Sequence, residues 1–411
     1  MKSFGRFLIL TVLPFALLFS LPFSLPSPLF AQGDEETTPE SKGQAQVEPL
    51  VTRRAKVFES GKDGYHTYRI PACVVTKRGT ILVFCEGRRK GRGDAGDIDM
   101  LVRRSEDGGK TWSPSTLIRT DAGNTCGNPC PVVDAQTGFV WLAMTWALGS
   151  DHESKVMKGE AERERRVLVT HSEDDGVTWS EPRDITKSVK KPYWRWYALG
   201  PCNAIQLERG EHAGRLLFPA NHSDHRDAAK HPYRSHVFWS DDHGKTWQLG
   251  GAHEDRTNES TLVELADGSV LQAMRSYHGK GNRALATSRD GGATWSKVRL
   301  EDELHTPVCQ ASLLRWTLPS AATSSESEDA PASKPGRILF SSPYGKQRSR
   351  LTIWWSEDEG QTWPHHVTVI EGAAAYSNLL KLPSGQLGLL YEAGGYASID
   401  LLEIDAARLF R

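Results

Sequence analysis

Short apolar runs separated by polar turns follow one another along the chain from about residue 51 to its end. Clear examples lie at 81–86, 139–146 and 216–222, and Asp267-Gly268 joins two further runs in the manner of a hairpin turn. Such runs, rich in β-branched and aromatic residues and bounded by Gly, Pro, Asn or Asp, are typical of strands. No long segment carries the apolar period of an amphipathic helix. The pattern therefore predicts an all-β protein.

An eight-residue motif, Ser-x-Asp-x-Gly-x-Thr-Trp, follows five of these runs. The copies lie at 105–112, 172–179, 240–247, 288–295 and 356–363, and their serines are 67, 68, 48 and 68 residues apart. Asp can accept hydrogen bonds from backbone N–H groups ahead of it, Gly allows a positive φ, and Thr-Trp suits the start of the next strand. Each copy predicts a hairpin tip with its tryptophan packed beneath it. We interpret the five aspartates as turn formers, because a catalytic group or ion site occurs once and not once per repeat.

The near-constant spacing of the motif predicts a repeated β architecture. Six radial sheets of about 60 residues each would account for about 360 residues, so we predict a six-bladed β-propeller over residues 51–411. In a propeller, strand ends from every blade meet near one axis, where Arg69, Glu259, Arg275 and an arginine near position 348 can converge. A Ser-, Ala-, Glu- and Pro-rich stretch at about 318–336 is expected to be a solvent-exposed insertion.

The N-terminus has the features of a secretory signal peptide over residues 1–31. Lys2 and Arg6 precede an apolar run, and the run ends at Ala31, near which we expect cleavage. Prolines at positions 14, 22, 25 and 28 interrupt the run and argue against a membrane-spanning helix. Residues 32–50 are polar and aperiodic, which indicates a disordered leader. We therefore expect an exported protein, periplasmic or extracellular, with no membrane span in its mature form.

The charge and the cysteine content bear on which partners, disulfides and metal sites the protein could have. The formal net charge is −1, and the charges are mixed along the chain without a basic block, which argues against a nucleic-acid partner. Six cysteines in an exported protein permit disulfides, with Cys73–Cys85 and Cys126–Cys130 as candidate pairs, but buried free thiols are at least as compatible with the sequence. No cysteine or histidine has a partner at metal-ligand spacing, so we predict no metal site.

Four segments carry side chains that could bind a ligand or take part in catalysis. The Gly-rich, charged segment 87–99 is either an active-site loop or a solvated one, and the charged segment 151–166 is expected to be mobile. Segment 192–197 contains four aromatic residues, which could stack on a sugar or simply pack. The hairpin around Asp267-Gly268 is more informative, because it places Glu259 at the start of one strand and Arg275 at the end of its partner, at the same edge.

These residues together resemble the exo-α-sialidase family. The repeated motif is that family's Asp box, Tyr68-Arg69-Ile70-Pro71 resembles its Phe/Tyr-Arg-Ile-Pro motif, and the similarity extends from about residue 57 to residue 392. Asp boxes alone also occur in other propellers and glycan-processing proteins. Their combination with Tyr-Arg-Ile-Pro, Asn128-Pro-Cys-Pro, Glu259, Arg275 and Ala375-Tyr-Ser is specific to the family.

The resemblance implies a role for eight residues. The three arginines that hold the substrate's carboxylate map to Arg69, Arg275 and Arg348, and Arg350 is a second candidate for the third position. The catalytic residues map to Asp94 as acid/base, Tyr376 as nucleophile and Glu259 as its carboxylate partner. Two further substrate contacts map to Arg88, near the sugar's O4, and to Asn128, where some bacterial members have an aspartate.

The implied activity is hydrolysis of terminal α-linked sialic acids from glycoproteins, glycolipids or oligosaccharides, with retention through a covalent sialyl-tyrosine and with no metal or organic cofactor. Tyrosine nucleophiles are a known exception to the two-carboxylate mechanism of glycosidases. Two alternatives stay open. One is a catalytically silent Asp-box propeller that binds glycans or proteins, and the other is a glycosidase for a related acidic nonulosonic sugar.

Overall fold

The computed structural model describes residues 49–224, 226, 233–320 and 334–411. The expected signal peptide at 1–31, nearly all of the leader at 32–50 and most of the insertion at about 318–336 lie outside the described residues. The first strand, β1, covers Val51–Glu59. Among the described residues, no helix combines the length and the apolar character needed to cross a membrane.

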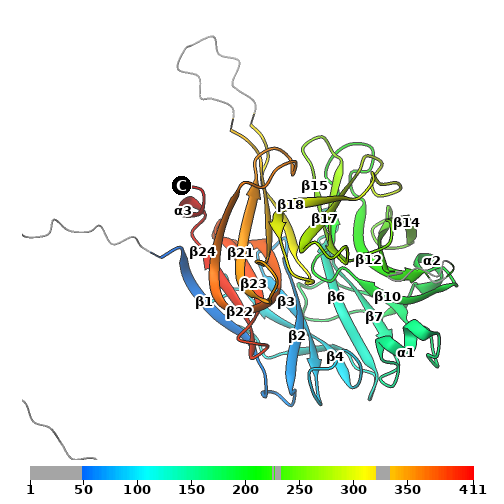
Figure 1. Cartoon of the computed structure of the whole chain (residues 1–411). Coiled ribbons are helices and arrows are strands. Elements are labelled where there is room, and N and C mark those ends of the chain that lie inside the picture. The colour runs from blue at the N-terminus through cyan, green and yellow to red at the C-terminus, as the bar shows by residue number, and fades with distance from the viewer. Residues whose placement is uncertain (1–48, 225, 227–232, 321–333) are drawn as a thin grey trace, which may run out of the picture. The chain divides into compact units, whose positions relative to one another are not determined.

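The described residues form 24 strands and three short helices. The strands form four hydrogen-bonded sheets, two of which each join two neighbouring blades, so that six antiparallel blades result, which we number in chain order (Figure 1). Blade one contains β2 (Thr67–Val75), β3 (Ile81–Arg88), β4 (Ile98–Ser105) and β5 (Thr116–Arg119). Blade two contains β6 (Thr125–Val133), β7 (Val140–Ala147), β8 (Arg166–Ser172) and β9 (Arg183–Asp184). Blade three contains β10 (Trp194–Leu199), β11 (Ile205–Gln206), β12 (Leu216–Asp224), β13 (Tyr233–Ser240) and β14 (Gln248–Ala252).

The second half of the chain builds the remaining blades in the same way. Blade four contains β15 (Thr257–Glu264), β16 (Val270–Ser276), β17 (Asn282–Ser288) and β18 (Arg299–His305). Blade five contains β19 (Ser312–Thr317), β20 (Arg337–Pro343), β21 (Ser349–Ser356) and the first part of β22 (His365–Lys381). Blade six contains the rest of β22, β23 (Leu387–Ala393), β24 (Ser398–Ile404) and β1. The helices α1 (Glu153–Lys158), α2 (Thr186–Val189) and α3 (Ala406–Leu409) lie in connections and at the C-terminus.

The ring is closed by pairing the two ends of the folded unit. Strand β1 runs antiparallel to β24, from Val51 opposite Ile404 to Glu59 opposite Ser398, and Figure 1 shows the two strands side by side. Strand β22 pairs with β21 up to Ala373 and with β23 from Ala374 onward, so it passes from the outside of blade five to the inside of blade six. The predicted six-bladed all-β propeller is confirmed.

The core lies in layers between neighbouring blades. In β7, Val140, Leu142 and Met144 pack against blade one, whereas Trp141 and Ala143 pack against blade three. Successive side chains of a strand point to opposite faces of its sheet. A strand buried on both faces therefore carries a nearly continuous apolar sequence, which explains the runs in the pattern.

Each Asp box forms a hairpin tip, as the sequence predicts. In the first copy, Asp107 accepts hydrogen bonds from the backbone N–H of Lys110 and Thr111, and Ser105 donates to Asp107 while accepting from the N–H of Gly109. The Thr111 hydroxyl also donates to Asp107, and this bond, together with those from the Thr111 N–H and Ser105, holds the pKa of Asp107 below its ordinary value. The next strand does not begin at Thr-Trp as expected. Strand β5 begins only at residue 116, because the backbone of the motif is committed to the turn.

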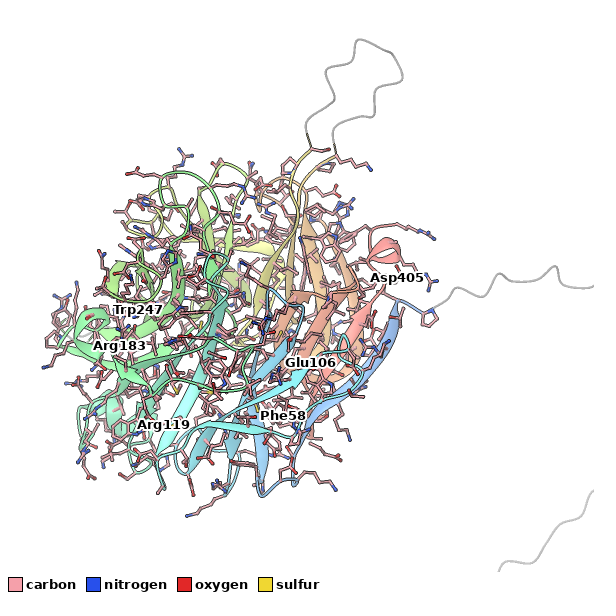
Figure 2. The ribbon with its side chains drawn as sticks, turned by 180° about the vertical axis from the view of Figure 1, so that it is seen from behind. Phe58, Glu106, Arg119, Arg183, Trp247 and Asp405 are labelled. Carbon is pink, nitrogen blue, oxygen red and sulfur yellow. The ribbon has the colours of Figure 1, made fainter. Side chains whose placement is uncertain are left out.

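An arginine of the preceding blade binds a carbonyl of every Asp box. The donors are Arg53, Arg104, Arg183, Arg215 and Arg299, and the acceptors are the carbonyls of Gly108, Asp175, Lys245, Gly291 and Gly360. Arg183 and Trp247 mark one such junction in Figure 2. The Asp boxes therefore join neighbouring blades at their rims, in addition to closing their own hairpins.

Candidate active site

All eight predicted site residues line one cavity of about 160 Å³. The cavity lies at the beginnings of the inner strands, where β2, β6, β10, β15 and β22 each contribute side chains. Arg88 and Asp94 come from the end of β3 and the loop after it, Arg275 from β16, and Arg348 from the residue before β21. Segment 87–99, which the sequence left undecided between an active-site loop and a solvated loop, therefore borders the cavity.

A break in strand register directs the inner-strand residues into this cavity. The pairing of five inner strands with their neighbours shifts between Arg69 and Ala72, Gly127 and Cys130, Trp194 and Tyr197, Thr257 and Ser260, and Ala374 and Ser377. A β-bulge of this kind bends the strand and re-aims a side chain. Ile70 and Asn128 consequently have positive φ values of 58° and 55°. The backbone N–H groups of both residues donate to buried carboxylates, which offsets the strain.

Tyr376 and Glu259 form the centre of the site. The Tyr376 hydroxyl donates to Glu259 Oε1 over 2.6 Å, and Arg275 Nη1 lies 2.8 Å from Glu259 Oε2 and 3.3 Å from the Tyr376 oxygen. Burial, reinforced by the Glu259 carboxylate, raises the pKa of Tyr376 well above its ordinary value. The phenol is therefore protonated at rest, with a carboxylate in place to accept its proton.

Three guanidinium groups surround the tyrosine. The Cζ atoms of Arg69 and Arg348 each lie 5.3 Å from the centroid of the Tyr376 ring, and Arg275 contacts its oxygen. Burial opposes the charged form of Arg275, but Glu259 and Tyr376 outweigh that effect and raise its pKa. All three arginines are therefore cationic, and together they make a strongly positive site for an anion.

The structure distinguishes Arg348 from Arg350. Arg348 Nη1 donates to the hydroxyl of Tyr396 over 2.9 Å and its guanidinium reaches Tyr376, whereas Arg350 is exposed and lies over Tyr344. Arg350 has a φ of 54°, and the pairing of β21 with β22 is irregular on both sides of Leu351. This irregularity separates two arginines that a regular strand would place on the same face.

Asp94 lies at the mouth of the cavity with its side chain 71% exposed. Its Oδ1 lies 2.7 Å from Arg88 Nη1 and 3.6 Å from Arg69 Nη1. Partial desolvation opposes the carboxylate, but Arg88 and Arg69 outweigh it and hold the pKa of Asp94 below its ordinary value. Asp94 is therefore ionised in the free protein.

Residues that line or support the cavity also lie outside the sequence prediction. Glu392 is fully buried, binds Arg69 Nε over 2.8 Å, and accepts from the backbone N–H of Ile70 and Tyr376. Arg165, also buried, donates to the carbonyl of Tyr197, and its guanidinium lies 4.1 Å from the ring of Trp196, which lines the cavity. Arg165 belongs to the segment 151–166, in which α1 forms; the mobility expected of that segment stays a prediction.

Some sequence signals could have found part of this arrangement. A proline inside a strand indicates an edge strand or a bulge, and Pro71 and Pro129 lie within the two bulges that carry Arg69 and Asn128. In the aromatic segment 192–197, Trp194 and Tyr197 pack in the core while Trp196 lines the cavity. The packing interpretation is therefore confirmed for Trp194 and Tyr197, and stacking of Trp196 on a sugar stays a prediction.

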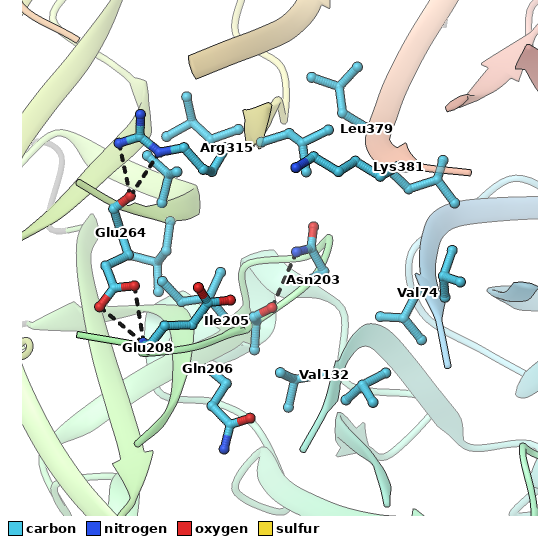
Figure 3. A pocket seen from close by; sticks show the side chains of 18 of the residues that line it. Val74, Val132, Asn203, Ile205, Gln206, Glu208, Glu264, Arg315, Leu379 and Lys381 are labelled. Atoms are coloured by element: carbon cyan, nitrogen blue, oxygen red, sulfur yellow. Dashed lines mark hydrogen bonds between the residues drawn. The ribbon is translucent and has the colours of Figure 1, made fainter. Parts of the chain in front are cut away.

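A second cavity of about 500 Å³ lies at the other ends of the inner strands. Figure 3 shows its walls, which include Val74, Val132 and Leu379. Two of its arginines have charged partners: Arg209 pairs with Glu264 over 2.6 Å, and Arg315 pairs with Glu359, which lies outside this cavity. The second cavity is larger than the first, but the thiol that lines it, Cys73, is neutral because burial raises its pKa.

The cysteines and the possible metal ligands are placed as follows. All six cysteines are buried free thiols, so neither candidate disulfide forms. Burial raises the pKa of Cys73 and Cys85 well above the ordinary value, which leaves both as neutral thiols. Within the part of the chain that the structure describes, no group of three or more His, Cys, Asp or Glu residues is arranged to hold a metal ion.

Comparison with known proteins agrees with the geometry. A family model described as a BNR repeat-like domain matches residues 79–389. A sialidase of Micromonospora viridifaciens is 35% identical over 86% of this chain, and an exo-alpha-sialidase of Aspergillus fumigatus is 30% identical over 80% of it. The solved structure of a Hadza microbial sialidase, Hz136, superposes with a TM-score of 0.73 at 29% identity, over 86% of this chain and 69% of that one.

The relatives differ in length from this chain. It spans 54% of the Micromonospora protein, 62% of a Bacteroides fragilis sialidase that is 31% identical, and 79% of the Aspergillus protein. In each comparison the matched region covers at least four fifths of this chain. The chain belongs to the sialidase family with BNR repeats.

Proposed function

We propose that the protein is a retaining exo-α-sialidase, which hydrolyses terminal α-linked sialic acids through a covalent intermediate on Tyr376. The observation that carries this proposal is the 2.6 Å hydrogen bond from Tyr376 to Glu259 in the centre of three guanidinium groups. A nucleophile, a base and an anion clamp thus meet in one cavity.

The arginines account for the choice of substrate. A sialic acid carries a carboxylate on its anomeric carbon, and guanidinium groups bind carboxylates with charge-assisted, often bidentate hydrogen bonds. Arg69, Arg275 and Arg348 would hold that carboxylate and set the anomeric carbon beside Tyr376. The cavity of about 160 Å³ suits a single sugar unit, which favours attack on a terminal residue.

A tyrosine nucleophile suits an anionic reaction centre. An ionised carboxylate would approach the substrate's carboxylate against electrostatic repulsion, whereas the Tyr376 phenol is neutral until it reacts. In the first step, Glu259 accepts the phenolic proton, the Tyr376 oxygen bonds to the anomeric carbon, and the bond to the leaving oxygen breaks. Asp94 gives its proton to that leaving oxygen.

Asp94 must gain a proton before this step, although it is ionised in the free protein. A substrate carboxylate bound between Arg69 and Arg348 would weaken the field of those cations on Asp94 and so favour its protonated form. In the second step, Asp94 takes a proton from water, the water oxygen attacks the anomeric carbon, and Tyr376 leaves with the proton held by Glu259. Two inversions give net retention.

The substrates in this proposal are sialylated glycoproteins, glycolipids or oligosaccharides. Export to the periplasm or the exterior, where such glycans would be met, is proposed only from the signal-like residues 1–31. That part of the proposal can be checked by N-terminal sequencing of the protein released by cells, with cleavage expected near Ala31.

Turnover of a fluorogenic methylumbelliferyl sialoside by the purified protein tests the activity. We expect wild-type hydrolysis, and in Tyr376→Phe a loss of about three orders of magnitude, equivalent to about 4 kcal/mol of transition-state stabilisation, with the circular dichroism spectrum unchanged. A folded wild-type protein without activity would favour the silent propeller or another acidic nonulosonic sugar. Near-normal turnover by Tyr376→Phe would remove the nucleophile assignment.

A further inference from the structure

One buried carboxylate at the cavity has no part in the proposed chemical steps. Glu86, on β3, is only 4% exposed and lines the cavity. Its Oε2 accepts from Arg88 Nε over 3.0 Å and from Arg88 Nη2 over 2.6 Å, and its Oε1 accepts from the backbone N–H of Asn128 over 2.8 Å. Both oxygens are thus fixed, one of them by an arginine that contacts Asp94.

Residues of blade two pack closely against the Glu86 carboxylate. A β-carbon on Gly127 would lie 2.4 Å from Glu86 Oε1, so only glycine leaves room for the carboxylate there. The register shift between Gly127 and Cys130 turns the N–H of Asn128 toward the same oxygen. The side chain is therefore held from both sides, by the bulge of β6 and by Arg88.

Arg88 connects Glu86 to the acid/base candidate. Its Nη2 binds Glu86 and its Nη1 binds Asp94 over 2.7 Å, so one planar guanidinium joins a fully buried carboxylate to an exposed one. A planar guanidinium held at Nε and Nη2 has a fixed direction for its Nη1. We propose that Glu86 is a positioning residue, which fixes Arg88 and offsets its charge so that Asp94 can hold and deliver a proton to the leaving group. This inference rests on the proposed function.

The charges around Asp94 set the direction of the effect. Arg88 faces it from β3, Arg69 from β2, Arg348 from the residue before β21, and Arg165 acts on it from the residue before β8. Glu86 lies behind Arg88 and reduces the net positive charge of this group. Without Glu86, the arginines would stabilise the Asp94 carboxylate further and oppose its protonation.

Leaving-group chemistry separates this role from a merely structural one. A methylumbelliferyl leaving group departs as a stabilised phenolate and needs little help from an acid, whereas a sugar hydroxyl, as in sialyllactose, needs a proton from Asp94. Loss of acid catalysis should therefore slow hydrolysis of sialyllactose much more than hydrolysis of the aryl sialoside. A distorted binding site should slow both reactions equally.

The test compares Glu86→Gln with Glu359→Gln on both substrates. Glu359 also pairs with an arginine, Arg315, over 2.5 Å and 2.8 Å, but it lies in the fifth Asp box, away from the cavity. We expect kcat/KM of Glu86→Gln to fall about tenfold more for sialyllactose than for the methylumbelliferyl sialoside, and the alkaline limb of its pH profile for sialyllactose to move to lower pH. Glu359→Gln should leave both substrates within about twofold of wild type.

Gly127→Ala supplies a second variant in case Glu86→Gln does not fold. It keeps the Glu86 charge but displaces the carboxylate, and the same preferential loss on sialyllactose is expected. Equal losses on the two substrates, or an unmoved pH profile in a folded variant, would overturn the positioning role while leaving the proposed function intact. A wild-type protein that cleaves neither substrate would overturn both.

Discussion

The choice between Arg348 and Arg350 can be decided by a matched pair of substitutions. The two residues are separated by one position, yet only Arg348 reaches Tyr376, while Arg350 lies over Tyr344. Replacing each arginine by alanine removes the same side chain and the same charge. Only Arg348→Ala should impair an activity that depends on binding a carboxylate.

The magnitude follows from the contacts that each side chain makes. In the free protein Arg348 donates to the Tyr396 hydroxyl and to the carbonyl of Val308, both near the surface, so its loss should cost little folding free energy. Toward a bound carboxylate it would contribute a charge-assisted hydrogen bond of about 1.5–3 kcal/mol. At about 1.4 kcal/mol per tenfold, this predicts a fall in kcat/KM of about 10- to 150-fold. Arg350→Ala should change kcat/KM by less than about threefold.

The assay is steady-state hydrolysis of a methylumbelliferyl sialoside by the two variants and the wild type at equal concentration. Urea unfolding of each protein shows whether stability has changed, since a folding defect would reduce the active fraction and imitate a binding defect. A larger loss in Arg350→Ala than in Arg348→Ala, with both variants folded, would refute the assignment of the third arginine.

Three further outcomes are expected. Glu392→Gln should reduce kcat/KM at least about tenfold, because an uncompensated loss of the Arg69 partner costs more than about 1.4 kcal/mol; retained activity would contradict its role in holding Arg69. Asp358→Ala should lower the urea midpoint without changing KM, since Asp358 only closes the fifth Asp box; a changed KM would contradict this. Burial lowers the pKa of His236 to about 3 and of His253 to about 4. At a pH above the unfolded pKa of about 6.5, both histidines are neutral in the folded and the unfolded protein and do not change stability. Below that pH they are protonated in the unfolded chain but stay neutral in the folded protein, which favours unfolding. These two histidines should therefore lower the unfolding free energy by about 3 kcal/mol from pH 6.5 to pH 5; urea titrations that agree at the two pH values would refute this.

Much of the fold follows from local sequence. The Asp-box turns depend on hydrogen bonds between residues at most four positions apart, such as those of Ser105 and Asp107, so the motif specifies them wherever it occurs. Apolar runs separated by turns predict hairpins, and their nearly constant spacing predicts that the hairpins are of one size. Repeated hairpins of one size are typical of propeller blades. The next strand does not begin at Thr-Trp: it begins at Gln248, directly after the third motif, and at Thr116 and Arg183 after the first two, because the backbone of the motif itself forms the turn.

The candidate site was predictable only in part. The residue types of the clamp, the nucleophile and the acid could be named from motifs, and the structure brings all eight of them to one cavity. Glu392 could not be named, because its partner Arg69 lies 323 residues away in the sequence. Glu86 could not be named either, because one of its partners is the backbone N–H of Asn128, which a bulge in the next blade turns toward it. Nor could Arg348 be separated from Arg350, since the irregular register of β21 depends on its pairing with β22.

The sequence by itself determined the secondary structure, the blade number and the kinds of side chain available for chemistry, because each of these depends on short-range patterns or on a repeat. Only the tertiary structure decided which side chains face the axis. Bulges in five inner strands, and contacts between blades that are distant in sequence, set those directions. Register and packing depend on neighbours across the sheet, and a linear pattern does not contain them.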